Sequence, residues 1–430
     1  MLSENKKILL LFPIPLLIVL GNKNIFFSFL AIVYIIYLML KNDSAHNYYL
    51  GLFLIPNIRI FDIIGVTFVV NILLSIPLFA YCLKNFNKLD YRPFLWTMLL
   101  FVIEINHAIV FQYYDDFFSI ASCFMGMLFC LLLSFDKNII IDIQIAWSYF
   151  TLGIINSSLV FLISHKGYAT DFFQNFILGE RFTAYANDPN YFSLYICLCL
   201  SFLFTLSHFY WFHYTFALIL IVLGLLTGSK MCFIMISFIF IFGYAYTFIN
   251  YHNKAKLKFS IISFFCFLTG YFYFYDKVII FISNLIKRAG LEKGVVSADR
   301  LTTGRWNIFL DYWNLFCSNI DVFLWGNGFK YHTILNQRFL AHNTYLDILL
   351  SWGMIGALIL IMIFYLWLGQ LEKKRELICY LPIMVLLINF LDLSCLSATM
   401  FWWIVSFCVN AARESPQKHN EFINERICIK

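Results

Sequence analysis

The sequence predicts an all-α polytopic membrane protein, a bundle of about 12 to 14 transmembrane helices with a large external loop that carries short interfacial helices. Of the 430 residues, 62% are hydrophobic and only 13% are charged, so a soluble fold would expose far more apolar surface than soluble proteins do. The apolar runs are continuous over about 17 to 25 residues instead of alternating in pieces of about 10, as barrel strands do. Since hydrocarbon admits only helices or closed barrels, these runs predict helices.

The candidate spans follow the apolar runs in chain order. They lie at residues 8–20, 25–40, 46–57, 62–82, 94–112, 117–134, 145–164, 191–207, 210–226, 231–250, 259–275, 345–368, 377–391 and 394–411. The third run is short, and a re-entrant helix is the alternative there. The sequence has no internal repeat and no Pro/Gly/Ser linker, so we expect one transmembrane domain over residues 1–430.

The short loops orient the bundle, because loops rich in Lys and Arg stay in the cytoplasm. Cationic clusters at residues 84–92, 254–258, 373–375 and 413–430 fall on one face, which is therefore the cytoplasmic one. Both termini are then cytoplasmic. Two long loops, residues 165–190 and 276–342, fall on the external face, and long loops cross regardless of their charge.

The longer external loop is basic, with eight cations against five acids over residues 276–342. This charge suits an anionic ligand, although a solvated loop attracted to anionic lipid head groups is the alternative. Within the loop, Trp306, Phe309, Trp313 and Phe316 recur at helical spacing and predict a helix at the membrane interface. The apolar stretch from Val278 to Ile286 predicts a second one.

Three polar residues stand near predicted membrane boundaries on the external face: Arg181, Arg305 and His342. Each has a purely structural interpretation when taken alone. Because all three map to one side of the membrane, we expect the fold to gather them in a single external site. Glu180, the acid beside Arg181, is expected to orient that arginine.

Both flanking motifs also predict helix starts. Asp188 is a natural N-cap and Pro189 a natural first helical residue. Before the run at 344–368, either Asn343 or Thr344 can cap the helix, and Thr344 with Asp347 matches a capping box.

Two ionisable residues, Glu104 and His107, lie within a predicted span and three residues apart, so they share a helical face. Charged groups inside a membrane are often functional. A mutual hydrogen-bonded pair that packs the bundle is the interpretation we favour.

The order and spacing of the motifs resemble those of the O-antigen polymerases and O-antigen ligases, a family of the bacterial envelope. The resemblance covers about residues 175 to 370 and rests on the following motifs: Arg181-Phe182, Asp188-Pro189-Asn190, Gly228-Ser229-Lys230, Gly304-Arg305, Gly326-Asn327-Gly328, and His342-Asn343-Thr344-Tyr345-Leu346 with Gly353 and Gly356. One departure is Lys230, where many relatives carry arginine, so the role of this residue is less secure.

The resemblance implies a membrane-embedded glycosyltransferase of lipopolysaccharide biosynthesis in the bacterial inner membrane, with its active site on the periplasmic face. The implied donor is a glycan on undecaprenyl diphosphate, and no metal or other cofactor is expected. Family members place two arginines and one histidine of external loops at the active site, which here would be Arg181, Arg305 and His342. The residues expected to bind substrate are Arg181, Arg305, Asn190, Asn343, Tyr345, Lys230 and Arg300. A chain-length regulator is a further expected protein partner, whereas nucleic acid is not.

Physical chemistry supports these roles independently. Breaking the bond between a sugar and a lipid diphosphate releases an anionic leaving group, which arginine forks can neutralise. The acceptor hydroxyl loses a proton as it attacks, and a neutral imidazole can take it. A helix N-terminus and nearby arginines both disfavour imidazolium, so His342 is the expected general base.

Two functions use this chemistry and differ only in the acceptor. A polymerase transfers the glycan to the sugar hydroxyl of a second lipid-linked repeat unit, and this is the function we expect. A ligase transfers it to a lipid A-core acceptor, and nothing in the sequence separates the two securely. A lipid-linked oligosaccharide flippase is a less favoured alternative, because transporters usually show repeated halves. A scaffold protein would leave the two arginines and the histidine unexplained.

Overall fold

The computed structural model is helical throughout the residues that it describes. These are residues 4–21, 24–60, 91–113, 117–135, 141–165, 181–186, 188–206, 210–249, 261, 283, 305–337, 340–369, 377–394 and 401–413. Within them, every regular element is an α-helix or a 3-10 helix, which confirms the predicted all-α class. The predicted spans at 62–82 and 259–275 and the predicted interfacial helix at 278–286 lie outside the described residues, apart from the single positions 261 and 283.

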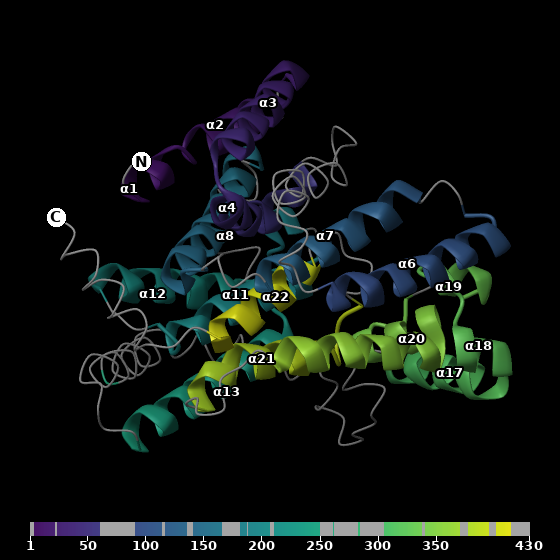
Figure 1. Ribbon diagram of the computed structural model, residues 1–430. Helices are drawn as coiled ribbons and strands as arrows, with labels where there is room; N and C mark the ends of the chain where they lie inside the picture. The colour runs from purple at the N-terminus through teal and green to yellow at the C-terminus, as the bar shows by residue number, and fades with distance from the viewer. Residues whose placement is uncertain are drawn as a thin grey trace.

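The N-terminal helices form a group at the top of Figure 1. They are α1 (Glu4–Leu9), α2 (Pro13–Gly21), α3 (Ile25–Lys41), α4 (Ser44–Leu54) and the 3-10 helix η1 (Ile55–Ile60). The first predicted span is divided between α1 and α2, because Pro13 lacks the N–H that a continuous helix would need and instead begins α2. Helix α2 packs against α3.

Helix α4 is enclosed by the rest of the protein. Its residues from His46 to Leu54 are all buried, and the helix packs against α8 and α22. The short third run of the sequence is therefore a helix buried on all sides, which ends in η1.

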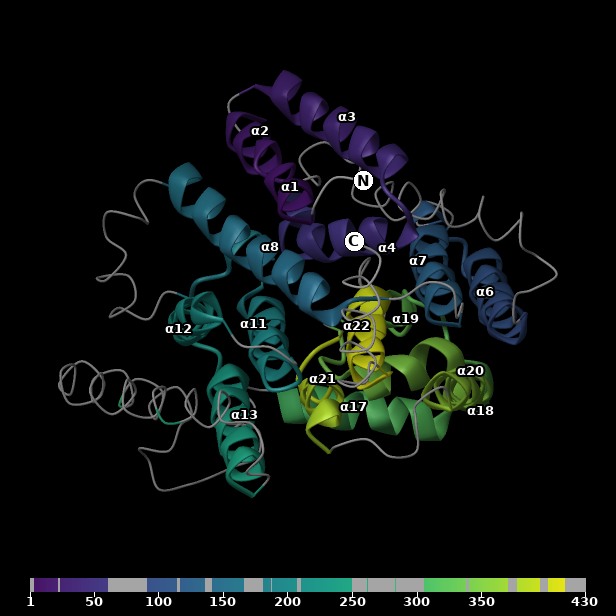
Figure 2. The same ribbon diagram turned by 60° about the vertical axis from the view of Figure 1, so that its left-hand side comes forward.

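The remaining helices build the body of the molecule. They are α6 (Arg92–Val110), α7 (Phe117–Phe135), α8 (Ile143–Ser164), η5 (Ala184–Ala186), α11 (Pro189–Leu203), α12 (Trp211–Leu226), α13 (Lys230–Ile249), α17 (Arg305–Ser318), α18 (Ile320–Trp325), α19 (Tyr331–Ile334), α20 (Thr344–Leu368), η7 (Leu377–Tyr380), α21 (Leu381–Asn389) and α22 (Phe401–Arg413). In Figure 2, α12 and α13 lie on one side, α6, α7 and α20 lie on the other, and α8, α11 and α22 lie between them.

Two of these helices, Ile143–Ser164 and Thr344–Leu368, are long and apolar enough to cross a membrane. Shorter apolar helices of 10–17 residues coincide with other predicted spans. Helix α20 also presents apolar side chains outward: Leu358 is 56% exposed and Ile361 is 60% exposed.

Helix α20 is broken at Gly353, where the backbone leaves the helical region with φ 62° and ψ −168°. A break removes the intrahelical donors of the preceding carbonyls, and buried carbonyls need partners. The Gly326–Gly328 turn supplies them: the Asn327 N–H donates to Leu350 O at 2.8 Å, and the Gly328 N–H donates to Ser351 O at 2.7 Å. Any Cβ at Gly353 would lie 2.3 Å from Leu324 O, so the close approach requires glycine.

Glu104 of α6 holds the same turn from the other side. Its carboxylate accepts hydrogen bonds from Phe329 N (2.9 Å), Tyr113 Oη (3.0 Å) and Trp352 Nε1 (2.9 Å). The predicted pairing with His107 is wrong: among the described residues, His107 Nδ1 has no hydrogen-bond partner. Glu104 instead joins α6, the turn and the break in α20.

Helix α17 confirms the helical spacing predicted for its aromatic residues, whose rings form one row of consecutive contacts from Trp306 through Phe309 and Trp313 to Phe316. Phe316 is buried with Tyr312 in a small separate core beneath α18 and α19. Trp306 and Trp313, each 43% exposed, lie on the outer face of the helix.

Candidate functional site

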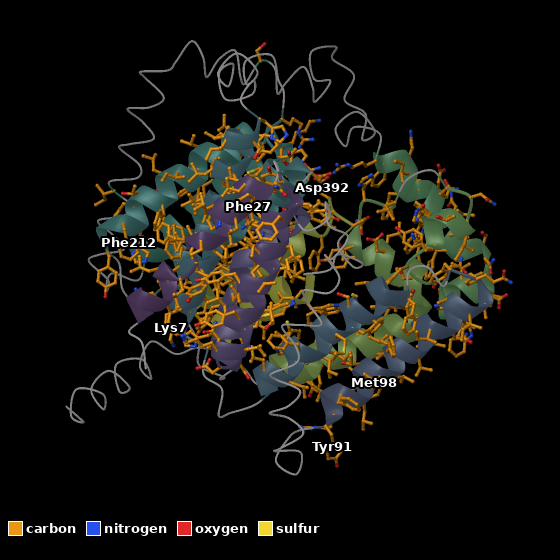
Figure 3. All side chains as sticks on the ribbon, turned by 90° about the horizontal axis from the view of Figure 1, so that it is seen from above. Lys7, Phe27, Tyr91, Met98, Phe212 and Asp392 are labelled. Atoms are coloured by element: carbon orange, nitrogen blue, oxygen red, sulfur yellow. The ribbon has the colours of Figure 1, made fainter. Side chains whose placement is uncertain are left out.

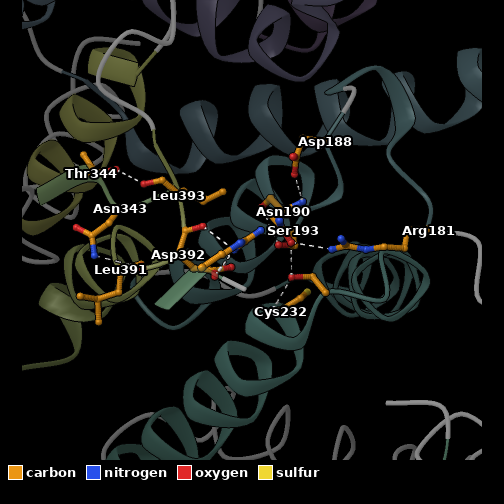
Figure 4. A network of polar contacts seen from close by, with 12 residues as sticks. Arg181, Asp188, Asn190, Ser193, Cys232, Asn343, Thr344, Leu391, Asp392 and Leu393 are labelled. Atoms are coloured by element: carbon orange, nitrogen blue, oxygen red, sulfur yellow. Dashed lines mark hydrogen bonds and ion pairs between the residues drawn. The ribbon is translucent and has the colours of Figure 1, made fainter. Parts of the chain in front are cut away.

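Arg181 is fixed at the point where α12 gives way to α13. Its Nε donates to Thr227 O at 3.0 Å, and its Nη2 donates to Asn190 Oδ1 at 2.7 Å. The neighbouring Phe182 N–H bonds to Leu226 O at 3.0 Å, so the segment lies against the end of α12. Thr227 O and Asn190 Oδ1 are thus two acceptors that orient the guanidinium, and Figure 4 shows the bond between Arg181 and Asn190.

Asn190 is the centre of this cluster. Its Oδ1 also accepts a hydrogen bond from Ser229 Oγ at 3.0 Å, and Ser229 precedes Lys230, the first residue of α13. The Asn190 N–H donates to Asp188 Oδ1 at 2.6 Å, which confirms Asp188 as the N-cap and Pro189 as the first residue of α11. One amide side chain thus ties the start of α11 to the start of α13 and to Arg181.

Arg305 begins α17 and forms an ion pair with Asp392, in the turn that follows α21. Its Nη1 donates to the Asp392 carboxylate and also to Asp392 O at 3.0 Å. The two side chains are 22% and 27% exposed, so solvent reaches the pair. Asp392 is labelled in Figure 3, between the helices around α11 and the segment that contains α17 to α19.

His342 occupies a left-handed backbone conformation, with φ 51°. Few residues other than glycine adopt this conformation, and histidine is among those that do so most readily. This conformation immediately precedes Asn343, whose Oδ1 accepts from Leu346 N at 3.0 Å as the N-cap of α20. The predicted capping box of Thr344 and Asp347 is therefore not formed.

The pKa of His342 is lowered from its ordinary value of 6.5. Burial is the largest cause, and the positive charge of Arg305 adds to it, whereas the carboxylates of Asp188 and Asp392 act in the opposite direction. At neutral pH the imidazole is consequently uncharged and able to accept a proton. His342 is therefore in the electrostatic field of Arg305, of Asp392 and of Asp188 at the cap of α11.

The start of α20 is seated on the turn after α21 by three hydrogen bonds. Thr344 N donates to Phe390 O at 2.8 Å, and Thr344 Oγ1 donates to Leu393 O at 2.5 Å. Asn343 Nδ2 donates to Leu391 O at 3.4 Å (Figure 4). The turn that contains Asp392 is thereby held beside His342.

The residues predicted to bind substrate divide into three groups. Arg181, Asn190 and Arg305 have side chains in the two polar clusters described above. Asn343 and Tyr345 make structural bonds, since Asn343 caps α20 and Tyr345 Oη donates to Leu387 O at 2.8 Å. Lys230 lies beside Ser229 at the start of α13, whereas Arg300 lies outside the described residues. Glu180, which was predicted to orient Arg181, also lies outside them.

Sequence reasoning missed Asp392, the acid that pairs with Arg305. The available signal was an acid in the short turn between the predicted spans 377–391 and 394–411, on the same face as His342. The sequence motifs predict no site role for Ser229, and they predict Asp188 only as a helix cap. The structure gives Ser229 a place in the Arg181 cluster and Asp188 an electrostatic effect on His342.

Comparisons with known proteins add no family assignment. The sequence matches no family model. A search of curated proteins likewise finds no match.

Proposed function

We propose that this chain is an O-antigen polymerase, a membrane glycosyltransferase that extends a lipid-linked glycan on the external face of the bacterial inner membrane. The donor is a glycan on undecaprenyl diphosphate, and the acceptor is a sugar hydroxyl of a second lipid-linked repeat unit. The observation that carries the proposal is that Asn343, the residue after His342, is bonded to the turn in which Asp392 pairs with Arg305. Burial and the charge of Arg305 lower the pKa of His342, as a general base requires.

The reaction follows from these groups. The acceptor oxygen attacks the anomeric carbon of the donor, and the bond from that carbon to the diphosphate oxygen breaks. The electron pair leaves with undecaprenyl diphosphate, whose negative charge is stabilised by the guanidinium groups of Arg305 and Arg181. The proton of the acceptor hydroxyl passes to the neutral imidazole of His342.

The ion pair of Arg305 suits a diphosphate site. Among the described residues, Asp392 is the hydrogen-bond partner of Arg305, and it is bonded through Nη1 alone. A planar guanidinium offers five N–H donors in a fork that matches phosphate oxygens. The remaining donors of Arg305 are thus suited to contact the leaving group.

The membrane arrangement is part of the proposal. The chain is a polytopic bundle of the inner membrane with both termini in the cytoplasm and the site on the periplasmic side. Two helices of spanning length, shorter apolar helices at other predicted spans and outward-facing apolar side chains on α20 support this arrangement.

Transfer by purified protein tests the function. The protein is reconstituted with an undecaprenyl-diphosphate-linked repeat unit, and the products are separated by glycan length. Arg305→Ala and Arg181→Ala should each lower transfer by about 100-fold or more. Arg305→Lys should rescue poorly, because an ammonium lacks the planar fork. His342→Gln should lower the rate while donor binding persists, because glutamine accepts a hydrogen bond but not the proton.

Lys41→Ala, which removes an exposed cation from α3, is the matched control and should transfer normally. If both arginine variants also give the wild-type ladder of products, the site lies elsewhere. If transfer occurs only when a lipid A-core acceptor is added, the protein is a ligase with the same catalytic groups.

A further inference from the structure

Three short segments carry or orient the groups assigned to transfer and would have to keep their relative positions during the reaction. The first is residues 341–343, which contains His342 itself. The second is residues 391–394, which contains Asp392, the partner of Arg305. The third is the start of α11, residues 188–191, whose Asp188 acts on His342 and whose Asn190 orients Arg181.

We propose that Asp347 is a positioning residue that holds these three segments in register. This inference rests on the proposed function and extends it to a residue that touches neither substrate nor the reacting atoms. Asp347 lies in the first turn of α20 and is 4% exposed. Its Oδ1 accepts hydrogen bonds from two hydroxyl groups, those of Tyr331 and Ser394.

The Tyr331 hydroxyl connects Asp347 to the histidine segment. It donates to Asp347 and accepts the Ala341 N–H at 3.0 Å, and the tyrosine is 2% exposed. Ala341 is the residue before His342, whose backbone is held at φ 51°. A chain of two hydrogen bonds therefore runs from the carboxylate to the backbone beside the general base.

Ser394 connects Asp347 to the other two segments. Its Oγ donates to Asp347 at 3.1 Å, and its backbone oxygen accepts the hydroxyl of Tyr191. Tyr191 belongs to α11 and directly follows Asn190. Asp392 lies two residues before Ser394, so a single carboxylate links the Arg305 partner, the α11 start and the His342 segment.

Helix capping does not account for this carboxylate. In a capping box the acid stands three residues after the N-cap, but Asp347 stands four residues after Asn343, the N-cap of α20. Burying a carboxylate is costly unless hydrogen bonds compensate. The compensation comes from Tyr331 and Ser394, which belong to segments on opposite sides of the residue in sequence, 16 residues before it and 47 residues after it.

Such a link would fix the positions of the reacting groups relative to one another. Displacing reacting groups by about 1 Å can lower a rate about 100-fold while substrate still binds. Asp347 variants should therefore lower kcat much more than they raise KM for the lipid-linked donor. If Asp347 were needed only for stability, its substitution would reduce the amount of folded protein but leave kcat and KM of the folded molecules unchanged.

The test uses three variants of the full-length protein. Tyr331→Phe breaks the link to residues 341–343, Ser394→Ala breaks the link to residues 391–394, and Asp347→Asn weakens both. Tyr365→Phe is the matched control. It also removes a tyrosine hydroxyl, but Tyr365, in the same helix as Asp347, is 70% exposed. Two measurements are made on each: backbone hydrogen exchange of the two segments, and kcat and KM for the donor.

We expect Tyr331→Phe to speed exchange in residues 341–343 but not in 391–394, Ser394→Ala to do the reverse, and Asp347→Asn to affect both. We expect kcat to fall about 10- to 100-fold in Asp347→Asn, with KM changed less than about threefold. If exchange is unchanged in Tyr331→Phe and Ser394→Ala, the inference is overturned. It is also overturned if exchange rises but kcat per folded molecule stays at the control value.

Hydrogen exchange separates this inference from the proposed function. If the wild-type protein transfers no glycan, the proposed polymerase function fails. The exchange pattern would still show whether Asp347 couples residues 341–343 to residues 391–394.

Discussion

Replacing Asp392 by asparagine tests the role of the Arg305 ion pair. The change removes the charge that competes with a diphosphate, while the bond from Arg305 Nη1 to the backbone oxygen of residue 392 can keep the arginine in place. A partly exposed ion pair of this kind, with side chains 22% and 27% exposed, contributes about 1 kcal/mol. Removing this competition should tighten donor binding about fivefold, since 1.4 kcal/mol corresponds to a factor of ten.

The same substitution should move the pH dependence of transfer. The Asp392 carboxylate raises the pKa of His342, so its removal should lower that pKa further. A base is active when it is unprotonated, and the rate therefore falls as the pH drops through its pKa. In Asp392→Asn this fall should occur at a lower pH than in the wild type.

Donor affinity and the pH profile of kcat are measured on reconstituted protein, with Asp311→Asn as the control. Asp311 is an exposed acid of α17, so the control makes the same change in charge and size. Weaker donor binding in Asp392→Asn would refute the reasoning. In that case the carboxylate would be needed to aim Arg305 and would not compete with the ligand.

The other predictions concern topology and stability. An impermeant thiol reagent should label the exposed Cys317 from the periplasmic side, and Cys317→Ser should abolish this labelling. In the Cys317→Ser background, a cysteine in place of the exposed Tyr91 should remain unlabelled. The reverse pattern of labelling would invert the topology. Gly353→Ala should lower the free energy of unfolding by about 2–4 kcal/mol in a denaturant titration, because residue 353 has φ 62° and its new Cβ would lie 2.3 Å from Leu324 O. The control Gly369→Ala, where φ is −62°, should lower it much less. Glu104→Gln should cost about 1–3 kcal/mol in the same titration, because an amide cannot accept from all three donors, and an unchanged midpoint would contradict this.

Local features of the fold were predictable from the sequence because their causes are local. Asp188 and Pro189 indicated where α11 begins, since capping involves residues within one turn of each other. The apolar runs likewise predicted helices that the structure contains, including Ile143–Ser164 and Thr344–Leu368. The division of the first run at Pro13 is also a local effect, although the run at 8–20 was predicted as one continuous span.

The polar contacts of the site depend on long-range packing, which spacing does not encode. Arg305 and Asp392 are 87 residues apart, and Glu104 and Phe329 are 225 residues apart. The capping-box prediction failed for a local reason, because Asn343 and not Thr344 is the N-cap of α20. The pairing of Glu104 with His107 failed because the carboxylate bonds to a backbone N–H and two side chains beyond its own helix.

The enclosure of α4 ties the beginning of the chain to its end. Trp403 of α22 stacks on Tyr48 with ring centroids 5.5 Å apart, and its ring passes so close to Gly51 that a Cβ there would lie 2.5 Å away. A nascent chain therefore cannot finish covering α4 until nearly all of the protein has been synthesised. A chain that stops before residue 401 would lack this contact, and Tyr48 and the backbone at Gly51 would lose their cover by Trp403.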